Sequence, residues 1–149
     1  MSFAKPSLKG RALRLLSGRE YSRAELERKL ENFEEEPGTL AQALDELEGK
    51  GFISEQRVIE SVVHRRAAKL GNARIKQELQ GKGLDPEAVA EALTRLQASE
   101  RERALEVWRK KFGAPPADAQ AAAKQIRFLA SRGFGGDVIR RVVAGATDD

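Results

Sequence analysis

RIKQELQGKGLDPEAVAEAL, at residues 74–93, is followed fifty positions later by KQIRFLASRGFGGDVIRRVV, at residues 124–143. The matched positions are Leu79 with Leu129, Lys82 with Arg132, Gly83 with Gly133, Leu84 with Phe134, Val89 with Ile139 and Leu93 with Val143. A third copy of the apolar pattern lies 49 positions earlier, where Leu26, Leu30, Leu40, Leu44 and Leu47 match Ile75, Leu79, Val89, Leu93 and Leu96. A period near 50 is typical of repeat proteins, which present long surfaces to large partners.

Each copy predicts three short amphipathic helices, so that the chain holds nine helices in three tandem units. The expected units are residues 1–53, 54–98 and 99–149. A single short helix cannot bury its narrow apolar stripe, whereas three helices packed together form a small core, and stacked units extend it. We therefore expect an all-α fold of three helix-turn-helix-like repeats in an elongated, curved array.

Capping signals place the starts of these helices. The predicted starts are Ser22 with Glu25, Thr39 with Gln42, Ser54, Asn72, Asp85-Pro86-Glu87, and Ser99 with Glu102. The acidic run Glu34–Glu36, followed by Pro37-Gly38, predicts a loop, because like charges repel and Pro-Gly interrupts a helix. A partner contact at this run is the alternative interpretation.

Composition narrows the class of protein. Of the 149 residues, 40% are hydrophobic, 34% are charged and none is cysteine, which excludes a disulfide scaffold and a thiol nucleophile. The chain has no run of about 18 apolar residues that could span a membrane, and no apolar segment of a signal peptide follows Met1–Pro6. We expect no membrane partner and a cytoplasmic location.

The sequence contains no recognisable combination of residues for a catalytic site or a metal site. His64 is the only histidine, and its basic surroundings favour a surface side chain over a general base. Gly133–Gly136 does not follow a strand, so a helix stop and turn is favoured over a phosphate loop. Trp108 and Phe112 share a helix face with Leu105, which favours core packing over a platform for stacking bases. We expect no catalytic residue, no metal and no cofactor, and hence no enzyme.

The charge changes sign along the chain. Residues 1–30 carry eight Lys and Arg against three acids, residues 31–60 two against nine, and residues 61–84 six against one. Basic clusters can contact phosphates or an acidic protein surface, and a merely solvated face is the alternative. The candidate binding residues are Arg65, Arg66, Lys69, Arg74, Lys76, Lys82, Arg109, Lys110, Lys111, Arg127, Arg132, Arg140 and Arg141.

An ordered series of short stretches resembles the RecX regulatory family over about residues 8–144. The stretches are Leu8–Leu13, Glu20–Leu26, Gly51–Glu55, Gly71–Ile75, Glu78-Leu79, Lys82–Leu84, Trp108–Gly113, Arg127–Leu129 and Arg132–Phe134. Residues 128–134 are the most specific part of the series. Residues 55–59 depart from the family, which more often has an Asp and a Phe-Ala pair there.

The resemblance implies a cytoplasmic protein of three three-helix repeats that modulates, and mainly inhibits, the RecA recombinase. Such a protein would lie in the groove of the RecA–DNA filament, affect filament growth, ATPase and strand exchange in recombination and DNA repair, and have no catalytic residues. We expect a monomer that binds RecA filaments and, weakly and without sequence preference, single- or double-stranded DNA. The alternative is a general helix-turn-helix-type DNA-binding protein that acts through phosphate contacts, which the salt dependence of binding would distinguish.

Overall fold

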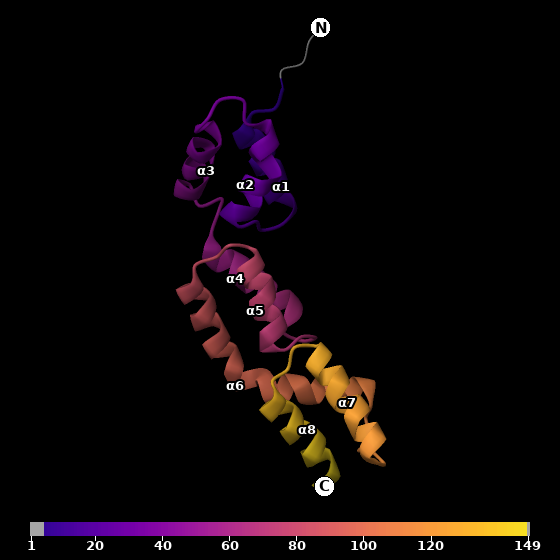
Figure 1. The fold of residues 1–149 in the computed structure, drawn as a ribbon. Helices are drawn as coiled ribbons and strands as arrows, with labels where there is room; N and C mark the ends of the chain where they lie inside the picture. The colour runs from indigo at the N-terminus through magenta and orange to yellow at the C-terminus, as the bar shows by residue number, and fades with distance from the viewer. Residues whose placement is uncertain (1–4, 149) are drawn as a thin grey trace.

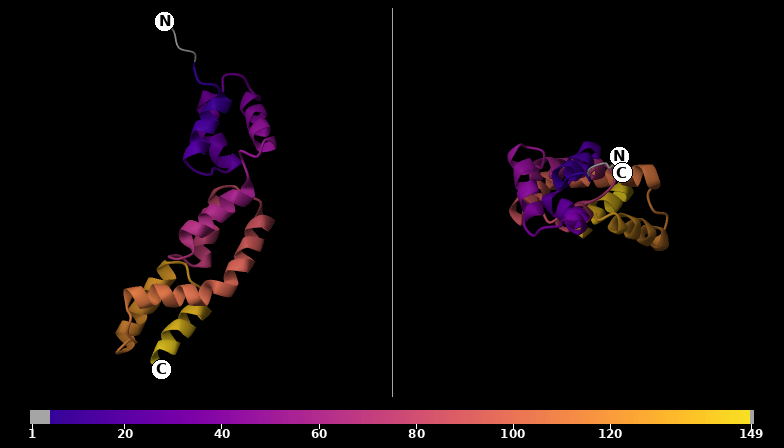
Figure 2. Two further views of the ribbon diagram at one scale, coloured as in Figure 1. Left: turned by 180° about the vertical axis from the view of Figure 1, so that it is seen from behind. Right: turned by 90° about the horizontal axis from the view of Figure 1, so that it is seen from above.

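The computed structural model describes residues 5–148, and all regular structure within this range is helical. The elements are α1 (Leu8–Gly18), α2 (Arg23–Leu30), the 3-10 turn η1 (Glu31–Phe33), α3 (Thr39–Gly49), α4 (Glu55–Arg66), α5 (Asn72–Gly81), α6 (Pro86–Lys111), α7 (Ala119–Ser131) and α8 (Gly136–Asp148). Residues 1–4, on which part of the signal-peptide expectation rests, lie outside the described range. Figures 1 and 2 show an elongated, bent stack with α1–α3 at one end and α7 and α8 at the other.

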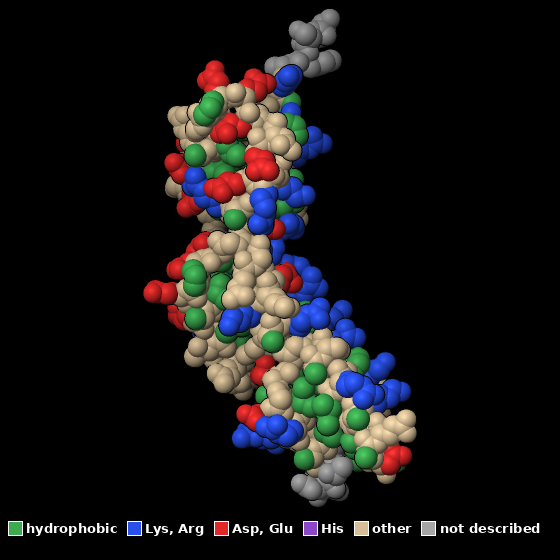
Figure 3. All heavy atoms as spheres, in the orientation of Figure 1, with side chains coloured by type: hydrophobic (Ala, Val, Ile, Leu, Met, Phe, Trp, Pro, Cys, Tyr) green, Lys and Arg blue, Asp and Glu red, His purple; other side chains and the backbone are tan. Residues whose placement is uncertain are grey.

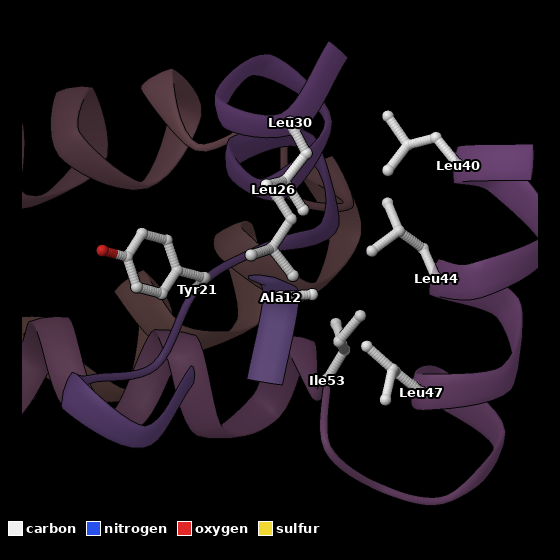
Figure 4. Close-up of a cluster of buried hydrophobic side chains, with 8 residues drawn as sticks. All are labelled: Ala12, Tyr21, Leu26, Leu30, Leu40, Leu44, Leu47 and Ile53. Atoms are coloured by element: carbon white, nitrogen blue, oxygen red, sulfur yellow. The ribbon is translucent and has the colours of Figure 1, made fainter. Parts of the chain in front are cut away.

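Three separate hydrophobic cores divide this stack into three units. The first unit (α1–α3) packs Leu26, Leu44 and Leu47 at its centre, as Figure 4 shows. The second unit (α4, α5 and the first half of α6) is centred on Ile75 and Leu79. The core of the third unit (the second half of α6, α7 and α8) consists of Ala104, Trp108, Leu129, Phe134, Ile139, Val142 and Val143. The predicted all-α class with three tandem three-helix repeats is therefore confirmed.

Several predicted helix starts are correct because a side chain satisfies backbone N–H groups at each of them. The Ser22 hydroxyl accepts the N–H of Glu25 at 3.1 Å, and the Glu25 carboxylate accepts the N–H of Ser22 at 2.9 Å. Ser54 caps α4, and Asp85 caps α6 with a proline in its first turn. These local signals decide where each helix begins.

Three predicted caps are wrong, of which Thr39 and Asn72 are each the first residue of their helix and the third, Ser99, lies inside α6. The cap residue before α3 is Gly38, which has φ of +90°. The N–H of Leu40, which has no acceptor within the helix, donates to the carboxylate of Glu34 at 2.9 Å and not to the side chain of Thr39. Asn72 is the first residue of α5 and not its cap, and its N–H is bound at 2.8 Å by Glu100. Carboxylates from elsewhere in the chain replace the predicted local caps of α3 and α5.

The expected ninth helix does not exist in the described residues, because α6 runs through Ser99 without a break. The hydroxyl of Ser99 donates to the carbonyl of Leu96 at 3.1 Å instead of capping a new helix. The same carbonyl also accepts from Arg103 at 3.3 Å. Side chains that compete for a helical carbonyl bend the helix, and Figure 2 shows α6 changing direction near its middle. The expected border between residues 98 and 99 therefore falls inside one bent helix.

Candidate interaction surface

Lys and Arg side chains gather along one long edge of the molecule. In Figure 3 they follow the right-hand side from the first unit to the third and also appear at the left of the third unit, while Asp and Glu cover the top, front and left of the first unit and the left of the second. The sign change along the sequence thus becomes a separation of charge across the molecule. An edge that is mainly basic attracts a partner of the opposite sign.

Polar contacts join the first unit to the second. The buried hydroxyl of Ser22 donates to the carbonyl of Lys82 at 2.6 Å. The ammonium of Lys82 lies 3.1 Å from the carboxylate of Glu25, which also pairs with Arg19 at 3.0 Å. The side chains of Lys82 and Glu25 are both only 12% exposed. Lys82 therefore belongs to the junction between the units and not to the exposed basic edge.

The environment of Glu25 stabilises its charged form. Partial burial acts to raise its pKa, but the N–H of Ser22 and the cations of Arg19 and Lys82 outweigh this effect, so the pKa falls from 4.5 to about 2. The junction thus keeps a carboxylate ionised that would otherwise titrate in weak acid.

Backbone groups join the second unit to the third. The N–H of Gly71 donates to the carbonyl of Arg132 at 2.8 Å, and the N–H of Ala73 donates to the carbonyl of Gly133 at 3.1 Å. A Cβ atom at Gly71 would lie 2.4 Å from the carbonyl carbon and oxygen of Gly133. Two turns therefore touch through their main chains, which only glycine permits here.

A buried carboxylate and a half-buried guanidinium complete this second junction. Glu100 is 7% exposed and accepts the N–H of Asn72 at the start of α5. Arg103 donates to the carbonyls of Ala67 and Leu70, at 3.0 Å and 2.8 Å, and to the side-chain oxygen of Asn72 at 2.6 Å. Burial lowers the pKa of Arg103, and Glu100 opposes that change. Both residues lie on α6, so the long helix holds the end of α4 and the start of α5.

Four predicted binding residues come together at this junction. An open hollow of about 510 Å³ is lined by Arg66, Lys69, Leu70, Arg74, Gln77, Glu78 and Arg132. Arg74 donates to the carbonyl of Ser131 at 2.8 Å, and the guanidinium of Arg132 lies 4.8 Å from the ring centre of Phe128. These contacts fix two of the cations at the rim of the hollow.

Arg65 lines a different hollow, between the first and second units. This space of about 420 Å³ is also lined by Leu16, Ser17, Gly18, Arg19, Glu20 and Ser61. Glu78 lines the hollow between the second and third units, and its carboxylate lies 2.9 Å from Arg66 of that hollow and 3.5 Å from Arg65 of the other. The basic edge is therefore continuous across the second unit, with one carboxylate at its centre.

The remaining predicted residues are exposed but do not line either hollow. Arg109 pairs with Glu106, Arg140 pairs with Asp137, and Lys111 lies 5.3 Å from the ring centre of Phe128. The others, all exposed, are Lys76, Lys110, Arg127 and Arg141.

Sequence reasoning missed Arg19, Glu78 and Arg103. Glu78 could have been found from the sequence, because residues 61–84 contain six cations and Glu78 is the one acidic residue among them. Arg103 gave no such signal, because its partners lie about 30 residues away in the chain.

The described residues contain no group of His, Asp and Glu placed to hold a metal ion, and no helix among them is long and apolar enough to cross a membrane. His64 is exposed. Trp108 is buried in the third core and donates its ring N–H to Gln125 at 2.8 Å, which confirms the core interpretation over the stacking platform.

Fold and surface together define a tandem three-helix-repeat protein with one basic edge. Family models for the first, second and third three-helix domains of RecX match residues 9–47, 54–93 and 99–143. The chain is 54% identical over 137 residues to a protein of Leptothrix cholodnii named "Regulatory protein RecX", covering 92% of this chain and 87% of that one. A relative with the same name from Ralstonia nicotianae is 50% identical over 140 residues, covering 94% and 88%. The chain belongs to the RecX family of regulatory proteins.

Solved structures agree with this fold. A crystal structure of RecX from Lactobacillus salivarius aligns with a TM-score of 0.77 over 95% of this chain and 96% of that one, at 21% identity. A crystal structure titled "regulatory protein RecX" aligns with a TM-score of 0.71 over 95% and 72%, at 22% identity. At such identities the agreement concerns the fold alone.

Proposed function

We propose that this protein modulates, and mainly inhibits, the RecA recombinase by lying in the groove of the helical RecA–DNA filament. The observation that carries the proposal is the basic edge that runs over all three units. A filament groove offers acidic protein surface and DNA phosphate at regular intervals, and an elongated repeat protein with one basic edge is complementary to both. Bound there, it changes filament growth, ATP hydrolysis and strand exchange.

The second junction supports a role as an extended, fixed surface. The second and third units share α6, and their turns meet through the backbone bonds of Gly71 and Ala73. The cations of the hollow are therefore held at set distances from one another, so binding loses little conformational entropy. On this proposal the protein acts as a monomer in the cytoplasm, by binding and not by catalysis.

A recombination assay tests the proposal directly. The protein is added below stoichiometry to RecA-promoted strand exchange and to hydrolysis of ATP by RecA on single-stranded DNA. We expect both rates to fall. Unchanged rates at a stoichiometric excess of the protein would contradict the proposal.

Charge reversal locates the binding surface. The double variant Arg66→Glu and Lys69→Glu changes two residues of the hollow. The control is the double variant Lys50→Glu and Arg95→Glu, which changes two exposed residues, one directly after α3 and one on α6. Each pair contains one lysine and one arginine that pairs with a glutamate, so the change in charge and the loss of an ion pair are matched. We expect only the first variant to lose inhibition while both keep the wild-type melting temperature. Equal inhibition by both folded variants would show that the hollow is not part of the surface.

A general DNA-binding protein is the second candidate function, and the cluster of Arg66, Lys69, Arg74 and Arg132 around one hollow favours it. Binding through phosphates alone weakens by orders of magnitude between low and moderate salt. Tight, strongly salt-dependent binding of bare DNA, together with no effect on RecA, would favour this candidate over filament binding.

A further inference from the structure

One carboxylate interrupts the basic edge at its centre. Glu78 projects from α5 toward α4, where its two oxygens lie 2.9 Å from Nε of Arg66 and 3.5 Å from Nη2 of Arg65. Its side chain is 26% exposed, and those of the two arginines are 45% and 44% exposed. Glu78 is therefore a half-buried anion that holds two cations at the open surface.

Four cations surround the hollow that Glu78 also lines. Arg66, Lys69, Arg74 and Arg132 approach the same open hollow from the end of α4, from the turn after α4, from α5 and from the turn after α7, respectively. Arg74 and Arg132 are fixed there by the carbonyl of Ser131 and the ring of Phe128. Four cations around one hollow, held from separate elements, are complementary to a phosphate group.

A phosphate that enters this hollow meets Glu78 in two ways. The carboxylate already accepts the Nε–H of Arg66 at 2.9 Å, a donor that would otherwise bind a phosphate oxygen in this hollow. In addition, its own negative charge repels the phosphate at short range. A phosphate therefore binds here only if the ion pair between Glu78 and Arg66 opens or if other contacts offset the repulsion by Glu78.

We propose that the hollow between the second and third units binds a phosphate of a nucleic-acid backbone, and that Glu78 is the specificity-determining residue that weakens this binding. This inference rests on the basic edge of the proposed function and names what its central residues recognise. Glu78 lowers the affinity for bare nucleic acid, so that stable binding requires further contacts, such as those that a protein-coated filament supplies. A protein with such a restraint does not spread over free DNA.

The test measures binding of fluorescent oligo(dT) by anisotropy at 50, 100 and 200 mM NaCl, with no recombinase present. The variants are Glu78→Gln and its control Glu91→Gln, which makes the same change in net charge and also frees an arginine, Arg95, that lies 3.6 Å from Glu91 on α6. Two released ion pairs at an exposed site predict that Glu78→Gln binds about two- to thirtyfold more tightly. Its log–log salt slope steepens by about 0.7 for each additional phosphate contact. The control is expected to stay within about twofold of wild type, which is the effect of one distant charge.

Two further measurements make the result specific. Adding Lys69→Gln to Glu78→Gln is expected to reverse the gain in affinity, because it removes a cation of the same hollow. Melting temperatures of all variants show whether the folded state is kept, and Glu78→Ala serves as the second probe if the glutamine variant is unstable.

Three outcomes would overturn the inference. The first is an equal gain for Glu78→Gln and Glu91→Gln, which would reflect net charge alone. The second is weaker binding by Glu78→Gln and Glu78→Ala, which would mean that the carboxylate positions the arginines for the phosphate. The third is an equal gain in affinity for labelled poly-glutamate, which would mean that the hollow takes acidic peptides. Because no RecA is present, failure here leaves the proposed function standing, and failure of the strand-exchange assay leaves this inference standing.

Discussion

Replacing Gly133 with alanine is expected to open the junction between the second and third units. Gly133 has φ of +90°, and a Cβ atom there would lie 2.3 Å from Cγ and 2.7 Å from the backbone nitrogen of Arg74. The left-handed backbone costs an alanine about 1–2 kcal/mol. The collision involves main chain, so the turn that contains Arg74 must move away.

That movement breaks the hydrogen bonds of the junction. They are the bonds from the N–H groups of Gly71 and Ala73 and from the guanidinium of Arg74, with lengths of 2.8, 3.1 and 2.8 Å. Each contributes about 0.5–1.5 kcal/mol net. Together with the backbone term, Gly133→Ala should therefore lower the free energy of unfolding by about 3–6 kcal/mol.

Alanine substitutions at two other glycines separate the cost of the left-handed backbone from the cost of the collision. Gly38 also has φ of +90°, but nothing lies within 4 Å of a Cβ placed there, so Gly38→Ala should lose only about 1–2 kcal/mol. Gly71 has φ of −82°, so Gly71→Ala has the collision without the backbone strain and should lose about 2–4 kcal/mol.

Urea unfolding followed by the fluorescence of Trp108 measures the effect. This tryptophan is the only one in the chain and is buried in the third unit, beside the junction. The expected order of destabilisation is Gly133→Ala, then Gly71→Ala, then Gly38→Ala. If Gly133→Ala is no more destabilising than Gly38→Ala, the two turns do not hold the units together and the reasoning is refuted.

Three more predictions follow from the cores, the first junction and α6. Leu79→Ala and Leu129→Ala, both at positions that are fully buried, should each lower the free energy of unfolding by about 2–5 kcal/mol in denaturant titrations, and a loss below 1 kcal/mol would mean that no cavity forms. Because the pKa of Glu25 is lowered to about 2, its contribution, up to about 3 kcal/mol, is fully present above pH 4.5 and is lost as the pH falls toward 2. Melting temperatures of wild type and Glu25→Gln should converge over that interval, and a constant difference would contradict the assignment. Arg101→Pro should destabilise by about 3 kcal/mol or more because it interrupts a continuous α6, whereas Arg101→Ala is near neutral, and a tolerated proline would indicate a helix start at Ser99.

The sequence predicted the fold wherever local chemistry decides it. The hydroxyl of Ser22 and the Asp85-Pro86 pair begin helices as expected, because their partners lie within three residues. The buried leucines of the repeat form the cores because their spacing places them on one helix face. These features depend only on neighbours in the chain.

The errors concern residues whose partners are distant. Ser99 and Glu102 have the spacing of a capping box, but Arg103 is held by Ala67 and Leu70 of the preceding unit, and the helix continues. Similarly, Asn72 receives its cap from Glu100, 28 residues away. Tertiary contacts override local preference at both places, and spacing alone does not contain them.

The candidate surface was predicted in outline and not in its detail. Arg66, Lys69, Arg74 and Arg132 are brought to one hollow, although no pattern in the sequence joined these four residues and excluded the other nine. Glu78, which pairs with two of the predicted cations, was not singled out because a lone acid among bases is usually a solvated neighbour. Its importance depends on where α4 and α5 place it.

Lys82 and Arg132 match in the repeat as two cations, but what they share in the structure is the role of their backbone carbonyls. The carbonyl of each residue accepts a hydrogen bond from the preceding unit, from the hydroxyl of Ser22 in one case and from the N–H of Gly71 in the other. Ser22 and Gly71 are themselves separated by the same 49 positions that relate the first unit to the second. The repeat therefore preserves the carbonyl that accepts at each junction, while the side chains of the two residues differ in their contacts: that of Lys82 pairs with Glu25 inside the molecule, and that of Arg132 reaches the basic hollow. Equivalence in a repeat thus predicts what the main chain does at a position, and the function of its side chain has to be argued from the contacts at each unit.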